Sequence, residues 1–117
     1  MHVERTHHVD ASEPDEAGMY DYFYEYDIYR FTDGPTCVVA RSYAHEPDEA
    51  HFLRVEIEGH SRPMTDADFL DPLVFAAQGH LRAIGKVRLS WLSDRGVGYE
   101  LVPAAVAPSA RTSPPGR

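Results

Sequence analysis

The segment from His45 to His51 concentrates side chains that could hold a metal ion. It reads His-Glu-Pro-Asp-Glu-Ala-His, so two imidazoles and three carboxylates fall within seven residues, which is enough for a zinc-type ion. The histidines are six residues apart and Pro47 interrupts a helix, so the segment does not fit the helical His-Glu-x-x-His pattern. A polar loop explains the composition without a metal. We therefore assign no metal and no cofactor, and keep His45, Glu46 and His51 as candidate ligands.

Acid–base chemistry could use Glu25 or Asp27 as its carboxylate. Such a site needs a group with a shifted pKa in a cleft. Charged residues on neighbouring strands more often form cross-strand ion pairs. The side chains that could face these carboxylates are Arg41, Arg54, His60 and His80. Cys37 stands beside Val38 and Val39, which indicates a buried, inert thiol. We assign no catalytic residue and favour a protein that is not an enzyme.

These residues must be positioned by a sheet, because the run from Tyr20 to Phe31 has strong strand character. It holds five of the seven Tyr and two of the five Phe residues. Tyr20, Tyr22, Tyr24 and Tyr26 alternate with charged or other aromatic residues, and period-2 alternation predicts a strand with two unlike faces. The segment therefore predicts the fold class and leaves the function open.

Further strands are predicted at 36–43, 51–58, 86–92 and 97–102, each bounded by turn-forming residues. One main helix is predicted between them. Asp71 is its expected N-cap, Pro72 its first residue and Gly85 its stop, with the helix running to about Ile84. A short turn is expected just before it, at residues 66–69.

This order predicts an α+β fold. The simplest packing is a single antiparallel sheet of about five strands, in the order β-β-β-α-β-β, with the helix on one face. Residues 1–18 lack apolar periodicity and are expected to form a flexible acidic arm, and residues 19–103 form the one domain. The Pro, Ala and Ser-rich segment 104–117 is expected to be a disordered tail.

The facing of the first strand decides which residues are free to bind a partner. If its even-numbered residues pack on the helix, an aromatic patch mixed with charges lies on the other face, as protein interfaces favour. A reversed facing, or a cover provided by the N-terminal arm, would remove that patch. The candidate interface residues are Phe23, Glu25, Asp27, Tyr29, Phe31, Phe52 and Arg54.

A second hypothesis is a pocket between helix and sheet that binds a small ligand or serves an enzyme. Tyrosine hydroxyls on a buried face need polar partners, and ligand pockets are mostly apolar with a few polar groups. The residues expected to line it are Tyr22, Tyr24, Tyr26, His80 and Trp91.

Composition and charge narrow the function classes. The 117 residues are enough for one domain, and the net charge is −8. Most of that charge lies in residues 1–33, with nine acids and two bases. An acidic chain repels nucleic acid and anionic membranes, so we expect neither as a partner. No hydrophobic signal or disulfide pair is visible, which favours the cytoplasm. The leading hypothesis is a small, acidic, non-catalytic interaction module that forms a homodimer or binds a basic partner protein.

Overall fold

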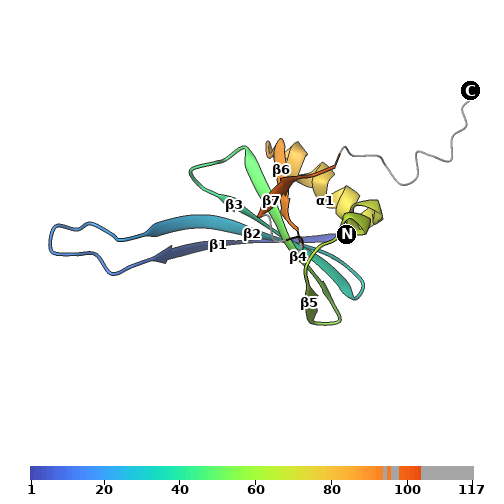
Figure 1. Cartoon of the computed structure of the whole chain (residues 1–117), viewed down its shortest axis with the longest axis horizontal. Helices are drawn as coiled ribbons and strands as arrows, with labels where there is room; N and C mark the ends of the chain where they lie inside the picture. The colour runs from blue at the N-terminus through green and yellow to red at the C-terminus, as the bar shows by residue number, and fades with distance from the viewer. Residues whose placement is uncertain (94, 96–97, 104–117) are drawn as a thin grey trace, which may run out of the picture.

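The computed structural model describes residues 1–93, 95 and 98–103, and in this part the chain folds as α+β with a seven-stranded sheet and one α-helix (Figure 1). The sheet has the order β1-β2-β3-β4-β6-β7, and β5 pairs with β4 beside this path. The strands are β1 His2–Ala11, β2 Phe23–Asp33, β3 Thr36–Tyr43, β4 Glu49–Ile57, β5 His60–Arg62, β6 Arg88–Leu92 and β7 Tyr99–Leu101. The tail expected at 104–117 lies outside the described residues.

The N-terminal segment is a strand, so the expectation of a flexible arm over residues 1–18 is wrong for residues 2–11. β1 pairs antiparallel with β2 along its whole length, from His2 opposite Thr32 to Ala11 opposite Phe23. As an edge strand, β1 has one neighbour and contributes only Val3 to the margin of the core. A strand that buries so little needs no alternating apolar pattern, which is why its sequence does not predict it.

The sheet is mixed, which corrects the expectation of a purely antiparallel sheet. β4 and β6 run parallel, with Ala50 opposite Leu89 and Phe52 opposite Trp91. Parallel neighbours need a long crossover connection. Here it consists of β5, the short 3₁₀ helix η1 (Asp66–Leu70) and α1 (Pro72–Ala83).

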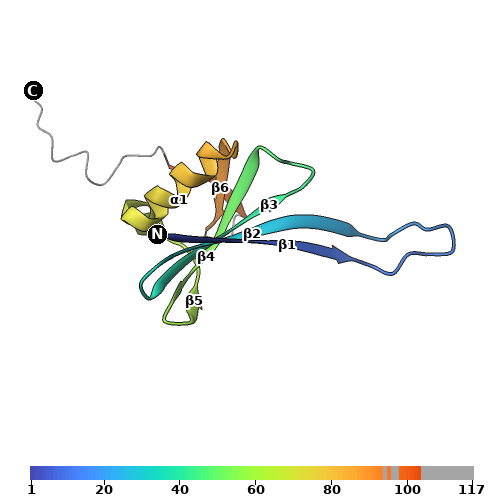
Figure 2. The same cartoon turned by 180° about the vertical axis from the view of Figure 1, so that it is seen from behind.

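The helix begins and ends where the sequence predicts. The Asp71 side chain accepts a hydrogen bond from the Leu73 amide at 2.8 Å, and Pro72 occupies the first turn. Gly85 has φ of +95°, the left-handed conformation that ends many helices. α1 packs through Leu73, Val74, Ala77 and Leu81 on one face of the sheet, and both views show it on that side (Figure 2).

The odd-numbered residues of β2, and not its even-numbered ones, face the helix, which is the reversed facing named in the sequence analysis. Tyr29 and Phe31 on β2, and Phe52 on β4, are at most 1% exposed in the core beneath α1. The His80 ring on the helix packs edge-on against Phe31. The even-numbered side chains of β2 therefore lie on the sheet face away from α1, which we call the open face.

The centre of the open face is covered by a small charged network. Arg30 and Arg54 both hydrogen-bond the carboxylate of Glu56, and Val39, which lies between the two arginines in the strand register, is fully buried. Long Arg side chains cover apolar surface with their stems in this way.

The β1–β2 hairpin projects beyond the rest of the sheet. The last pair between β2 and β3 is Tyr26 with Tyr43, whereas β1 and β2 continue to Ala11 and Phe23 and are joined by a loop. We call residues 9–25 the projecting hairpin, and Figure 1 shows it extending away from all other elements. Within the described residues, no helix is both long and apolar enough to cross a membrane.

Candidate functional site

The projecting hairpin exposes large apolar side chains with no element behind them. Tyr22 is 46% exposed and Met19 is 65% exposed, and the others fall between these values. The full set is Val9, Met19, Tyr20, Tyr22, Phe23 and Tyr24. Their rings pair with one another, with Tyr20 and Phe23 at 5.4 Å and Tyr22 and Tyr24 at 6.0 Å between centroids.

The loop of the projecting hairpin is held by specific hydrogen bonds. Ser12 donates its amide to the Tyr22 carbonyl, and its hydroxyl accepts the Asp21 amide at 2.8 Å. The Asp15 carboxylate accepts the amides of Ala17 and Met19, both at 2.9 Å. Side-chain caps of this kind are typical of ordered turns. Of the exposed aromatic residues, Tyr20 and Tyr22 are therefore displayed on a defined loop, while Phe23 and Tyr24 lie on β2.

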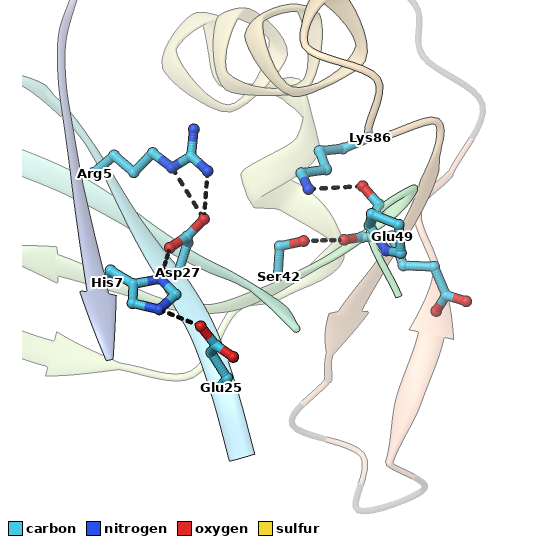
Figure 3. Close-up of polar contacts among 8 residues, drawn as sticks. Arg5, His7, Glu25, Asp27, Ser42, Glu49 and Lys86 are labelled. Atoms are coloured by element: carbon cyan, nitrogen blue, oxygen red, sulfur yellow. Dashed lines mark hydrogen bonds and ion pairs between the residues drawn. The ribbon is translucent and has the colours of Figure 1, made fainter. Parts of the chain in front are cut away.

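A charged clamp joins β1 to β2 at the base of the projecting hairpin (Figure 3). Arg5 donates from Nε and Nη2 to Oδ2 of Asp27, at 3.0 and 2.6 Å. His7 lies between two carboxylates, with Nδ1 2.7 Å from Asp27 Oδ1 and Nε2 2.8 Å from Glu25 Oε2. We call Arg5, His7, Glu25 and Asp27 the clamp.

Contacts within the clamp raise the pKa of His7 and lower the pKa of Asp27. Hydrogen bonds to Asp27 and Glu25 raise the pKa of His7 above 6.5. Partial burial acts to raise the pKa of Asp27, but the hydrogen bonds from His7 and Arg5 outweigh it and lower that pKa below 3.8. The raised pKa favours the imidazolium form of His7, in which both ring N–H groups donate to carboxylates. In that form the ring has no free nitrogen lone pair to act as a general base.

A hollow of about 270 Å³ lies beside the clamp, between the hairpin base, the β3–β4 turn and the end of α1. Lys86 donates to the Pro47 carbonyl at 2.6 Å, and the Ser42 hydroxyl donates to the Glu49 carbonyl at 2.6 Å. Figure 3 shows these two contacts opposite the clamp. Lys86 and Ser42 are thus engaged in structural hydrogen bonds. Its lining residues are Arg5, His7, Tyr26, Asp27, Ser42, Tyr43, Ala44, Pro47 and Lys86.

A row of rings crosses the open face from β1 to β7. Successive ring centroids are 4.6 to 6.3 Å apart along His8, Tyr26, Tyr43, His51 and Tyr99. The Arg41 guanidinium stacks 4.8 Å from the Tyr43 ring centroid and donates to the Tyr99 hydroxyl at 2.7 Å. Aromatic rings interleaved with Arg are typical of protein interfaces. This row continues the aromatic surface of the projecting hairpin onto the body.

The structure separates the candidate interface residues into three groups. Tyr29, Phe31 and Phe52 are core residues and cannot contact a partner. Glu25 and Asp27 belong to the clamp, and Arg54 is bound to Glu56. Phe23, 50% exposed on the projecting hairpin, is freely accessible. The other exposed apolar residues of the projecting hairpin were not among the candidate interface residues. They are Val9, Met19, Tyr20, Tyr22 and Tyr24.

The candidate pocket residues do not meet between helix and sheet. Tyr22, Tyr24 and Tyr26 lie on the face away from α1, whereas Trp91 is buried in the core against Phe69. His80 packs on Phe31 at the helix. Tyr22 and Tyr24 are exposed on the projecting hairpin, whereas Tyr26 is half-buried beside the hollow.

The candidate metal ligands are partly brought together. One ligand atom from each of Glu46, Glu49 and His51 falls within 4.8 Å of the other two. His45, the third candidate, is not in that set, but its Nε2 lies 3.8 Å from Glu46 Oε1. Glu49 was counted among the carboxylates of this segment in the sequence but was not kept as a candidate ligand.

Sequence reasoning also missed Arg5 and His7. Both lie in the segment expected to form a flexible arm, for which the sequence indicates no cross-strand partner. A usable signal was present, because no Lys or Arg occurs between Arg5 and Arg30, while seven acidic residues do. Arg5 of the clamp is the cation at the N-terminal end of this acidic segment, and Arg30 is the cation at its C-terminal end.

Comparisons with protein-family models, with curated proteins and with solved structures found no match to this chain.

Proposed function

We propose that this chain is a non-catalytic interaction module that binds a partner protein with a basic surface. Contact is made by the projecting hairpin and by the adjoining ring row of the open face. The observation that carries the proposal is the set of six large apolar side chains on the projecting hairpin, each at least 46% exposed. Soluble monomers seldom leave such a patch in water, and Tyr and Phe are enriched at interfaces.

The charge of the projecting hairpin indicates the chemistry of the partner. Residues 9–25 contain no Lys or Arg, and their acidic residues are Asp10, Glu13, Asp15, Glu16, Asp21 and Glu25. An acidic surface attracts a basic one over distances longer than contact and speeds association. Exposed carboxylates beside exposed rings therefore support a partner with Lys or Arg around an apolar centre.

The same charge argues against pairing of two projecting hairpins. Two copies meeting hairpin to hairpin would bring like charges together, which is unfavourable at low salt. Self-association would instead need a head-to-tail contact with another surface. Light scattering on the purified protein separates the cases, because a stable homodimer would replace a foreign partner in this proposal.

The test compares two charge-reversed variants in affinity capture from the native host. The pair Glu16→Lys with Asp21→Lys alters the projecting hairpin, where neither side chain makes a hydrogen bond in the described structure. The matched pair Asp33→Lys with Glu58→Lys reverses two exposed charges at the β2–β3 and β4–β5 turns, away from the hairpin. The hairpin pair should lose a salt-sensitive partner that the control pair retains. Equal capture by both variants would reject the proposal.

A cytoplasmic location is part of this proposal. It rests on the single, buried Cys37, which forms no disulfide. Fractionation of host cells with an antibody to the chain tests it directly.

A further inference from the structure

We propose that Glu46, Glu49 and His51 bind one divalent transition-metal ion of the zinc type, with His45 as a fourth ligand. The site lies at the β3–β4 turn and the start of β4, apart from the projecting hairpin. It shares His51 with the ring row, but the observations that carry the metal site do not depend on a partner protein.

The donor atoms are already gathered. The three groups of Glu46, Glu49 and His51 offer donors within 4.8 Å of one another. Donors around a tetrahedral zinc lie about 3.3 Å apart, given metal–ligand bonds of about 2.0 Å. Glu46 has a side chain 39% exposed, so it can close the remaining gap by rotation, and His45 stands beside it. The chain therefore needs only side-chain adjustment to reach a four-ligand set.

His51 is held from outside the cluster in the manner of a metal-binding histidine. Its Nδ1 lies 2.5 Å from the Ser90 hydroxyl, which belongs to the neighbouring parallel strand β6. Ligating histidines usually engage an oxygen with the ring nitrogen that does not bind the metal, which fixes the ring and its tautomer. Among the described residues, Nε2 has no hydrogen-bond partner and is the nitrogen left for a ligand bond.

Glu49 is also oriented by a group outside the cluster. Arg88 Nη1 lies 2.9 Å from Glu49 Oε2, and the Glu49 side chain is 16% exposed. This contact occupies one carboxylate oxygen and leaves the other for the metal. Carboxylates that bind a metal are commonly hydrogen-bonded in this way by a group that does not itself contact the metal.

The donor set selects the class of ion. Imidazole nitrogen combined with carboxylate oxygen suits zinc and its neighbours, whereas calcium and magnesium prefer oxygen alone. The site contains no thiolate, because Cys37 is buried in β3. We therefore expect zinc to bind and magnesium not to compete.

The experiment titrates the untagged full chain with Co²⁺ as a coloured probe and then displaces it with Zn²⁺. One cobalt per chain should bind with the visible spectrum of a four-coordinate nitrogen and oxygen site. Glu49→Gln and His51→Gln should each weaken binding by about tenfold or more. His8→Gln, which removes a β1 histidine outside the cluster, should leave the affinity unchanged.

Two results would overturn the site. The first is an absence of saturable uptake by the wild-type chain. The second is equal loss of affinity in the His8 and His51 variants, which would indicate scattered surface histidines. Because a His51 variant could disturb β4, Glu46→Gln at the turn serves as the second probe. Unchanged binding in Glu46→Gln and Glu49→Gln together would also reject the proposal.

Discussion

His7 Nδ1 lies 2.7 Å from Oδ1 of Asp27, the residue directly opposite it in the β1–β2 ladder. This contact falls where β2 loses its β3 neighbour, since the β2–β3 ladder reaches only to Tyr26. A lone two-stranded ribbon is marginally stable in water. The clamp is thus positioned to hold β1 and β2 together at the base of the projecting hairpin.

The pKa of His7 should lie above 6.5, because two carboxylates accept its protons. Asp27→Asn should lower that pKa toward its ordinary value by removing the larger of the two interactions. A proton NMR titration of the His7 ring measures both. Glu4→Gln changes a β1 carboxylate on the opposite face and should leave the His7 pKa unaltered. A His7 pKa at or below 6.5 in the wild-type protein would contradict the clamp.

The backbone amides of the projecting hairpin should be less protected from hydrogen exchange at low pH and at high pH than between them. The raised pKa of His7 means that its stabilisation is complete below 6.5 and is lost as pH rises through its folded-state value. The lowered pKa of Asp27 means that its stabilisation is present above 3.8 and is lost as pH falls through its own folded-state value. Protection should therefore be greatest between these limits. Hydrogen exchange of the hairpin amides, corrected for intrinsic rates, measures it.

The control for this pH dependence is His7→Gln, which retains hydrogen-bonding capacity without a titrating proton. Its hairpin amides should lose the decline in protection at higher pH. A decline that persists in His7→Gln would assign the effect to another group.

The facing of β2 predicts opposite outcomes for two phenylalanines on one strand. Phe31→Ala removes a fully buried ring and should lower the free energy of unfolding by about 3–5 kcal/mol. Phe23→Ala alters a ring that is 50% exposed on the projecting hairpin. This substitution should change the free energy of unfolding by less than about 1 kcal/mol. Urea unfolding of the two variants gives both values. Similar losses in both would mean that the hairpin packs on the body.

Local signals predicted the helix well, whereas the topology of the sheet depended on long-range packing. Asp71, Pro72 and Gly85 each act on their own neighbourhood, and the helix begins and ends beside them. The parallel pairing of β4 with β6 depends instead on the path of the crossover between them. No residue within either strand encodes that path.

The candidate site was less predictable for two physical reasons. β2 is aromatic on both faces, with Tyr24 and Tyr26 on one and Tyr29 and Phe31 on the other, so its pattern fits either facing. β1 buries almost nothing, so Arg5 and His7 could not be placed opposite Asp27. The aromatic run of β2 was visible in the sequence, but its position on a projecting hairpin required the register of β1.

The most direct test of the central claim is photo-crosslinking in the native host. A benzophenone amino acid at Phe23 probes the projecting hairpin, and the same group at Asp33 probes the exposed β2–β3 turn at the opposite end of β2. The account predicts a crosslink from position 23 to a basic protein and none to that protein from position 33. An absence of any adduct at position 23, or an adduct only between two copies of this chain, would contradict it.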